Sequence, residues 1–321
     1  MQIICVIYLF FIPLQRKSPR LSTYYICTCA LQATVRANTK QEHSTQMIGI
    51  FDSGYGGLTI LNHIRQQLPE YDYLYLGDNA RAPYGTRSFD VIYEYTLQAV
   101  NYLKEQGCNL IILACNTASA KALRTIQQNN INPDELRVLG VIRPTAEIAP
   151  ARTRTNHIGV LATPGTVASE SYVIELQKQD PNLVVTQQAC PMWVPLIESG
   201  EHIHDGADYF VEKYITELLE NDPLIDTIVL GCTHYPLLQD KIEQFLDKQT
   251  ISHQAVSVIA QGTIIAASLA DYLERHPDIA QRAIAGSNGH CTFLTTEAAN
   301  KFSDSASIFL DEEIQAIHIE L

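Results

Sequence analysis

The feature that most constrains this chain is an internal repeat of short apolar segments. The segment IGIFDSG at 48–54 matches IGVLATPG at 158–165, and LIILACNT at 110–117 matches IVLGCTHY at 228–235. Helical patterns alternate with these segments from residue 48 onward. Alternation of strands with helices predicts a parallel sheet covered by helices, and its repetition predicts two related units.

The repeat predicts an α/β fold with two pseudo-symmetric α/β domains, mainly parallel sheets and an active site in the cleft between them. The first domain is expected to hold 47–142 plus 259–321, and the second to hold 143–258. In open α/β sheets, ligands bind beyond the carboxyl ends of the strands. Cys115 and Cys232 both follow such strand ends, so we expect the site to lie between two thiols.

Residues 1–46 differ from the rest and are expected to form an N-terminal extension outside this fold. They carry five Lys and Arg against one Glu, a charge of +4, which leaves −17 for the remainder of the total of −13. Their apolar opening is shorter than the about 20 residues that span a bilayer, and it lacks the preceding positive charge of a signal peptide. Either translation begins at Met47, or the extension is a targeting or anchoring segment.

Composition and charge narrow the function further. A net charge of −13 argues against a nucleic-acid partner, because such proteins need a basic face. The eight cysteines are scattered along a chain with 46% hydrophobic residues, and from residue 47 on none has the close spacing of zinc ligands. We therefore expect a reduced, cytoplasmic protein with no metal site and no membrane partner.

The sequence after each strand-end cysteine favours a helix. Cys115 precedes NTASAKALRTI, in which Asn116 and Thr117 are good helix N-caps. A helix dipole stabilises a thiolate at its N-terminus, so we expect the pKa of Cys115 to lie below the ordinary value of about 8.5. After Cys232, Pro236 is typical of a first helical turn.

Further polar residues lie at the same strand ends. His234, two residues after Cys232, is either a helix-capping histidine or a proton-exchanging partner of the thiol. Asp52 ends the first strand, and Ser53 with the amides after it can hold a carboxylate or a phosphate. Both nucleotide-binding motifs are poor matches, because no lysine follows Gly54 and the glycine spacing is not G-x-G-x-x-G.

Five segments together resemble one enzyme family. They are IGIFDSGYGGLTIL, LGDNARAPYG, LACNTASA, ACPMWVPLIESGE and VLGCTHYPLL, and they are similar to the motifs of the glutamate racemases, in the cofactor-independent aspartate/glutamate racemase superfamily. The resemblance covers roughly 47–310. It implies interconversion of L- and D-glutamate without pyridoxal phosphate or another cofactor, D-glutamate being a building block of peptidoglycan.

The resemblance also implies residue roles. Two cysteines, Cys115 and Cys232, would act as base and acid on opposite faces of the substrate Cα. Asp52 would assist Cys115, His234 would assist Cys232, and Glu198 would be a further acid near the site. The substrate contacts that it implies are Asp52, Ser53, Tyr84, Gly85, Asn116, Thr117, Thr233 and His234.

The chain departs from the family at Ala260-Gln261-Gly262, where many members carry an Asp-Ser-Gly-like turn. This departure and the variable hinge residue Arg143 concern regulation and subunit contacts rather than the pair of thiols. We expect glutamate as the small-molecule partner and a homodimer as the assembly.

Three alternatives stay open. An aspartate racemase of the same superfamily usually has an acid in place of His234. A cysteine hydrolase would use a Cys/His pair but would leave the second strand-end cysteine without a role. A two-lobed amino-acid binding protein would bind glutamate without turning it over.

Overall fold

The computed structural model describes residues 47–249, 251–252, 254–284, 288–310 and 312–321. The predicted N-terminal extension, residues 1–46, lies outside the described residues.

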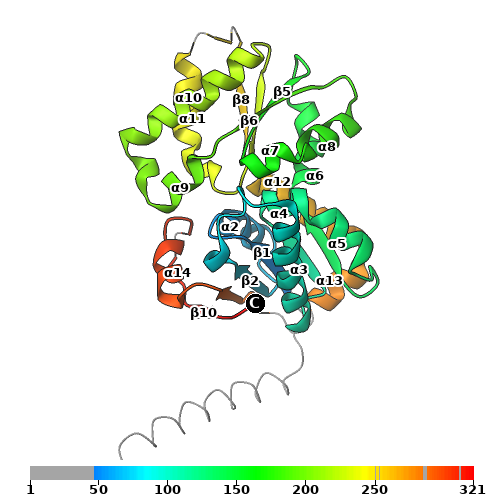
Figure 1. The fold of residues 1–321 in the computed structure, drawn as a ribbon. Helices are drawn as coiled ribbons and strands as arrows, with labels where there is room; N and C mark the ends of the chain where they lie inside the picture. Colours follow the sequence, from blue (N-terminus) through cyan, green and yellow to red (C-terminus); the bar gives the residue numbers. More distant parts are fainter. Residues whose placement is uncertain (1–46, 250, 253, 285–287, 311) are drawn as a thin grey trace, which may run out of the picture. The chain divides into compact units, whose positions relative to one another are not determined.

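Two parallel sheets organise the chain from residue 47 onward (Figure 1). The larger sheet has the strand order β10-β9-β2-β1-β3-β4, and the smaller one has the order β6-β5-β7-β8. All the pairings described in both sheets are parallel. The strands are β1 (Ile48–Asp52), β2 (Tyr73–Gly77), β3 (Leu110–Leu113), β4 (Arg137–Gly140), β5 (His157–Ala162), β6 (Val184–Ala189), β7 (Thr227–Gly231), β8 (Ser257–Ile259), β9 (Cys291–Thr295) and β10 (Ala316–His318).

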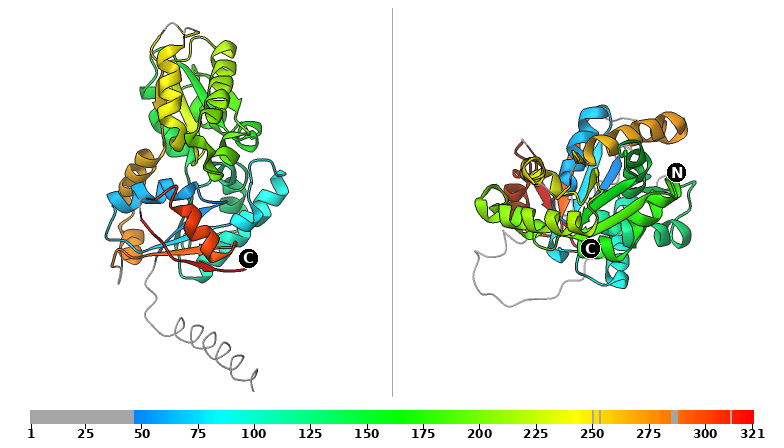
Figure 2. Two further views of the ribbon diagram at one scale, coloured as in Figure 1. Left: turned by 90° about the vertical axis from the view of Figure 1, so that its left-hand side faces the viewer. Right: turned by 90° about the horizontal axis from the view of Figure 1, so that it is seen from above.

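The first four strands of each half follow the same spatial order, which confirms the predicted pseudo-symmetric α/β fold. That order is β2-β1-β3-β4 in the larger sheet and β6-β5-β7-β8 in the smaller one. β3 and β7 therefore hold equivalent places, and Cys115 and Cys232 follow them. The larger sheet also contains β9 and β10 from the C-terminal part of the chain, drawn in orange to red in Figure 2.

The central strands are buried along their whole length. Every residue of β1, β3 and β7 is buried, as expected for parallel strands that are covered by helices on both faces. The edge strand β6, with the sequence VVTQQA, is only partly buried. The apolar segments of the repeat thus form the centres of the two sheets, and their carboxyl ends hold the predicted site residues.

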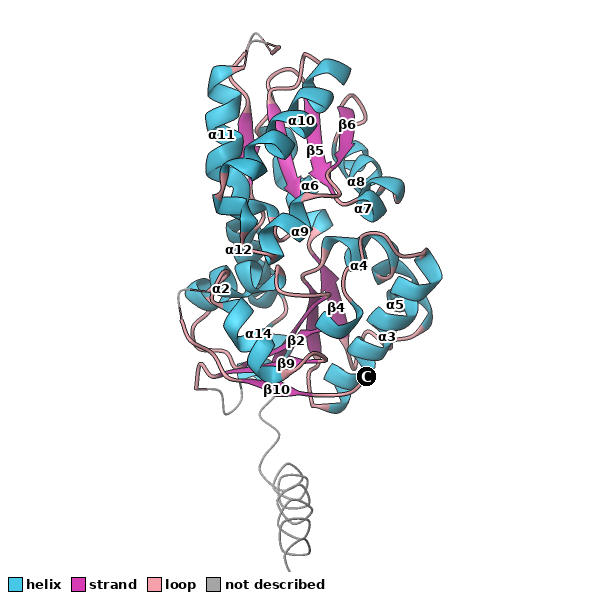
Figure 3. Cartoon of the chain, turned by 60° about the vertical axis from the view of Figure 1, so that its left-hand side comes forward, coloured by secondary structure: helices cyan, strands magenta, loops and turns pink. Residues whose placement is uncertain are grey.

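Helices surround both sheets (Figure 3). α12 packs against α2 and α6, which joins the segment after β8 to the first half of the chain. Within the described residues, no helix combines the length and the apolar character that crossing a membrane requires. The helices are α2 (Gly57–Gln67), α3 (Phe89–Glu105), α4 (Asn116–Lys121), α5 (Leu123–Asn129), α6 (Ile142–Ile148), α7 (Pro164–Ala168), α8 (Ser171–Gln179), α9 (Trp193–Glu198), α10 (Asp205–Asn221), α11 (Gln239–Lys248), α12 (Gly262–Arg275), α13 (Pro277–Ile284) and α14 (Ala299–Ala306).

The chain passes from one sheet to the other twice, and the two crossings lie side by side. β4 ends at Gly140 before α6, and β8 ends at Ile259 before α12. Between the crossings, the Gln261 Nε2 atom donates a hydrogen bond to the Val141 carbonyl oxygen at 3.2 Å. We propose domain boundaries at 142 and 259 on this basis, and we call the two parts the first lobe (47–142 plus 259–321) and the second lobe (143–258).

Candidate active site

Cys115 lies at the carboxyl end of β3, where it is the N-cap of α4. Its Sγ accepts a hydrogen bond from the Ala118 amide at 3.4 Å and lies 3.3 Å from the Ser53 hydroxyl oxygen. The sequence predicted Asn116 or Thr117 as the N-cap. The cap is the Cys115 thiol itself. The helix already begins at Asn116, so the residue before it holds the N-cap position.

The predicted low pKa of Cys115 is wrong. Burial, as the largest cause, and the charge of Asp52 raise the pKa of Cys115 to about 12. The hydrogen bonds from Ser53 and Ala118 favour the thiolate but do not offset these two effects. A six-residue helix offers only a small dipole against full burial. Cys115 is therefore a protonated thiol at neutral pH.

Cys232 lies directly after β7 and faces an imidazole. Its Sγ is 3.8 Å from His234 Nδ1, and His234 Nε2 is 3.0 Å from Glu198 Oε1. The loop is fixed by Tyr235, whose ring packs edge-on against Trp193 with centroids 4.7 Å apart. The imidazole thus contacts the thiol through one nitrogen and the carboxylate through the other.

His234 is a cation at neutral pH. Burial disfavours the imidazolium, but the hydrogen bonds to Cys232 and Glu198 outweigh burial and raise the pKa of His234 to about 10. His234 as a whole is 5% exposed, so solvent screens the charge of its ring little. A positive charge thus lies next to Cys232, where it can balance the negative charge of a thiolate.

Asp52 ends β1 beside the Cys115 thiol. Its Oδ2 atom accepts from the Gly54 amide at 2.9 Å, whereas Oδ1 is buried and has no hydrogen-bond partner among the described residues. Burial raises the pKa of Asp52, although the charge of His234 opposes this shift. A Cβ atom at Gly57 would lie 2.5 Å from the Asp52 Cβ, so only glycine fits there.

The two strand-end loops meet across the lobes. The charge of Cys232 contributes to the raised pKa of Cys115, so the two thiols interact electrostatically. The Thr59 hydroxyl donates to the Thr233 carbonyl oxygen at 3.0 Å, and a Cβ atom at Gly56 would lie 2.3 Å from His234 Nδ1. The structure thereby brings together six of the predicted residues: Asp52, Ser53, Cys115, Glu198, Cys232 and His234.

The other predicted residues border this group, but several of their side chains already have protein partners. The Tyr84 hydroxyl donates to the Asp78 carboxylate, and the Gly85 carbonyl oxygen accepts from the Gly165 amide at 2.7 Å. Thr117 Oγ1 lies 2.9 Å from Thr163 Oγ1. Both oxygen and nitrogen of the Asn116 amide are hydrogen-bonded, to Tyr172 and Gln261.

Sequence reasoning missed several residues at the site. It did not single out Tyr172 or Thr163, and it noted Gln261 only as a departure from the family. Thr163 has a signal, because the repeat aligns it with Ser53. Phe309 has none: its ring meets His234 edge-on at 5.4 Å, and this contact joins residues far apart in the chain.

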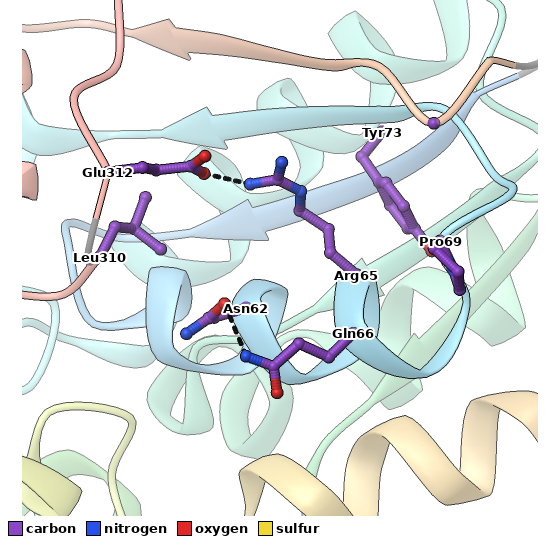
Figure 4. Close-up of a pocket in the computed structure, with 8 residues that line it drawn as sticks. Asn62, Arg65, Gln66, Pro69, Tyr73, Leu310 and Glu312 are labelled. Carbon is purple, nitrogen blue, oxygen red and sulfur yellow. Dashed lines mark hydrogen bonds and ion pairs between the residues drawn. The ribbon is translucent and has the colours of Figure 1, made fainter.

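A cavity of about 380 Å³ lies elsewhere on the first lobe (Figure 4). Arg65 and Glu312 form an ion pair in its wall, next to Asn62 and Tyr73. None of the residues that line it is a predicted site residue. In the described ranges, no three His, Cys, Asp or Glu side chains are arranged to hold a metal ion.

The arrangement of the thiols is suited to moving a proton between two faces of one carbon atom. Each thiol lies at the end of a central strand of its own sheet, and each has its own polar support. Proton transfer requires a donor and an acceptor within hydrogen-bond reach of the reacting atom. A single cysteine nucleophile would use only half of this arrangement.

Comparison of the sequence with known families finds the Asp/Glu/Hydantoin racemase family, which matches residues 57–267. The glutamate racemase of Ruegeria sp. (strain TM1040) is 42% identical over 277 residues, which cover 83% of this chain and 97% of the relative.

Solved structures of similar fold agree. The glutamate racemase isoform RacE1 from Bacillus anthracis has a TM-score of 0.76 at 32% identity and covers 87% of this chain and 99% of its own. The glutamate racemase from Francisella tularensis in complex with D-glutamate has a TM-score of 0.75 at 31% identity and covers 87% of this chain and 98% of its own.

Proposed function

The chain belongs to the Asp/Glu/Hydantoin racemase family, and from that premise we propose that it interconverts L-glutamate and D-glutamate by a two-base mechanism, supplying D-glutamate for peptidoglycan synthesis. One observation carries the proposal. Two buried thiols follow equivalent strands of the two sheets, and the segment after β1 contacts the loops of both: Ser53 Oγ lies 3.3 Å from Cys115 Sγ, and the Thr59 hydroxyl donates to the Thr233 carbonyl oxygen at 3.0 Å.

In the proposed reaction, Cys232 as a thiolate takes the α-proton from L-glutamate. The electron pair left on Cα is delocalised into the α-carboxylate, and the Cys115 thiol gives its proton to the opposite face. D-Glutamate leaves, with Cys232 now a thiol and Cys115 a thiolate. The reverse reaction starts from this state with the two roles exchanged.

The electrostatics of the site support this direction of proton flow. The raised pKa of Cys115 keeps its proton in place until a stronger base, the carbanion, appears. The charged His234 balances the negative charge on Cys232 Sγ before the reaction, and Glu198 holds the ring in place. On the other side, Asp52 favours the return of a proton to Cys115.

We propose that the substrate is held by the residues named from the family resemblance. The Asp52 Oδ1 atom, which has no partner among the described residues, would accept a hydrogen bond from the substrate ammonium. Ser53, Gly85, Thr117 and Thr233 would bind the carboxylates. Since the side chains of Tyr84 and Asn116 are already paired, these two would contribute through their main chains.

We also propose that turnover needs no cofactor, and that the protein is a homodimer of the reducing cytoplasm. The five cysteines in the described residues are free thiols, which fits a reducing compartment. Dialysis against a strong chelator should leave turnover intact, and sedimentation should give the mass of a dimer. A chelator-sensitive protein or a monomer would contradict these points.

Circular dichroism of L-glutamate and of D-glutamate, each incubated with the purified protein, tests the function. We expect the signal to decay to zero from either enantiomer, and much more slowly with aspartate. Faster decay with aspartate would assign the aspartate racemase activity instead. A protein that binds glutamate without changing its signal would be a binding protein, and an acyl-enzyme formed from an amide or ester would favour a hydrolase.

A further inference from the structure

Three buried side chains next to the thiols form a closed ring of hydrogen bonds. The Asn116 amide donates to Gln261 Oε1 at 2.7 Å, and Gln261 Nε2 donates to the Tyr172 hydroxyl oxygen at 2.8 Å. The Tyr172 hydroxyl donates to Asn116 Oδ1 at 2.7 Å. Each member donates to the next, so each bond polarises the following one and strengthens it.

The ring joins both lobes and both crossings. Asn116 begins α4 in the first lobe, Tyr172 lies in α8 of the second lobe, and Gln261 lies on the returning crossing just before α12. Gln261 Nε2 is also 2.9 Å from the hydroxyl of Thr145, in α6 on the outgoing crossing. At most 2% of each ring member is exposed, so no solvent competes for these bonds.

The ring also touches the chain segment of each thiol. Asn116 follows Cys115 directly in the sequence. The Tyr172 ring packs against Gly231, the residue before Cys232, so closely that a Cβ atom at Gly231 would lie 3.0 Å from its Cε2. The hydrogen-bonded ring is therefore attached to the segment of Cys115 through Asn116. It is attached to the segment of Cys232 through Tyr172.

We propose that Gln261 and Tyr172 are positioning residues that set the separation of Cys115 and Cys232 across the substrate. The inference rests on the proposed racemase function, since only a two-base reaction requires both thiols to reach one carbon from opposite faces. A misplacement of about 1 Å can cost an enzyme about 100-fold in rate. Neither residue is assigned a contact with the substrate.

The test uses Tyr172→Phe with Tyr73→Phe as the matched control. Tyr73 is also a buried tyrosine, and its hydroxyl donates to the Leu68 carbonyl oxygen at 2.6 Å, far in sequence from both thiols. In D₂O, each protein is given L-glutamate, and two rates are measured: racemisation, and exchange of the α-proton with retained configuration. Their ratio does not depend on how much of the sample is folded.

We expect racemisation by Tyr172→Phe to fall about 10-fold or more, while retained exchange persists, because Cys232 still reaches the α-proton but transfer to the opposite face is impaired. The ratio of exchange to racemisation should rise at least several-fold over that of the parent. In Tyr73→Phe the ratio should equal that of the parent.

Gln261→Met provides a second, independent break of the same ring. It should raise the same ratio, and the double variant with Tyr172→Phe should be no worse than the worse single variant, because a ring is broken only once. Additive effects would contradict a shared ring. If Tyr172→Phe fails to fold, the ratio in Gln261→Met decides.

The outcomes separate this inference from the function on which it rests. A parent protein that leaves both enantiomers of glutamate unchanged overturns the proposed function before any variant is compared. A parent that racemises glutamate, together with ring variants whose ratio equals that of Tyr73→Phe, overturns the positioning roles alone.

Discussion

The two thiol sites occupy equivalent places in the two lobes but differ in almost every neighbour. The repeat aligns Cys115-Asn116-Thr117 with Cys232-Thr233-His234. It also aligns Asp52, at the end of β1, with Ala162, at the end of β5. The end of β1 therefore supplies a carboxylate at the thiol of the first lobe, whereas the end of β5 supplies none. At the thiol of the second lobe, the neighbouring side chain is the imidazole of His234.

This difference shows that the fold determines where the thiols lie, while their neighbours determine where the protons reside. Cys115, beside the Asp52 carboxylate, has a pKa raised to about 12. At Cys232 the charged partner is His234, whose pKa is raised to about 10 and which Glu198 stabilises. One half thus holds a protonated thiol, and the other holds an imidazolium next to its cysteine.

Replacement of either cysteine should have the largest effect on the rate of racemisation. Cys232→Ala and Cys115→Ala should each reduce racemisation by more than about 1,000-fold in both directions, because inversion needs both faces. In D₂O, Cys232→Ala should still exchange the α-proton of D-glutamate slowly with retained configuration, through the minor thiolate form of Cys115, and Cys115→Ala should do so only for L-glutamate. Racemisation by Cys232→Ala at near the parent rate would disprove the two-thiol mechanism.

Replacement of His234 or Asp52 should show which of the two proton transfers each residue assists. His234→Asn should lower kcat/KM by about 100-fold or more, equally in both directions, because the two enantiomers have equal free energy in water. The proton transfer that a residue assists is instead revealed by the kinetic isotope effect on each enantiomer. In His234→Asn, an α-deuterium should slow the conversion of L-glutamate more than that of D-glutamate. In Asp52→Asn, it should slow the conversion of D-glutamate more. Isotope effects that do not depend on the enantiomer would contradict separate partners.

Glu198→Gln should have a smaller effect, visible mainly in the pH profile. The Glu198 hydrogen bond helps to raise the pKa of His234, so its loss lowers that pKa. Activity that needs the imidazolium is lost as the pH rises through the pKa of His234, about 10 in the parent. The alkaline limb of kcat/KM should therefore move to lower pH in Glu198→Gln. An unmoved limb would mean that His234 acts without Glu198.

The smallest expected effect is a gain in stability in Asp52→Asn. Burial raises the pKa of Asp52 above its ordinary value of 3.8, so the ionised carboxylate is less favourable in the folded state at neutral pH. Its replacement should raise the Tm by about 2 to 4 °C for each kcal/mol of stability gained. The same replacement should impair activity. The gain should shrink as the pH falls through the folded pKa and vanish below 3.8. A lower Tm at neutral pH would contradict this account.

The sequence predicted the topology and the place of the thiols, because both follow from local patterns. Apolar segments of fixed spacing became β1, β3, β5 and β7, and their ends carry Asp52, Cys115 and Cys232.

What the sequence could not predict depends on contacts between distant segments. The pKa of Cys115 is dominated by burial, which the whole fold creates, so a local rule about helix termini gave the wrong sign. The ring of Asn116, Tyr172 and Gln261 draws one side chain from each of three separate segments. No spacing within any one segment could have indicated it.

The first sheet is interrupted in the sequence, and this has a consequence for how the chain folds as it is synthesised. β2 is made early, but one of its edges pairs with β9, beginning with Tyr73 beside Cys291. The whole second lobe is synthesised in between. An unpaired strand edge is prone to associate with other chains, and contacts between such distant residues form slowly. The nascent protein therefore carries an unfinished edge until β9 has left the ribosome.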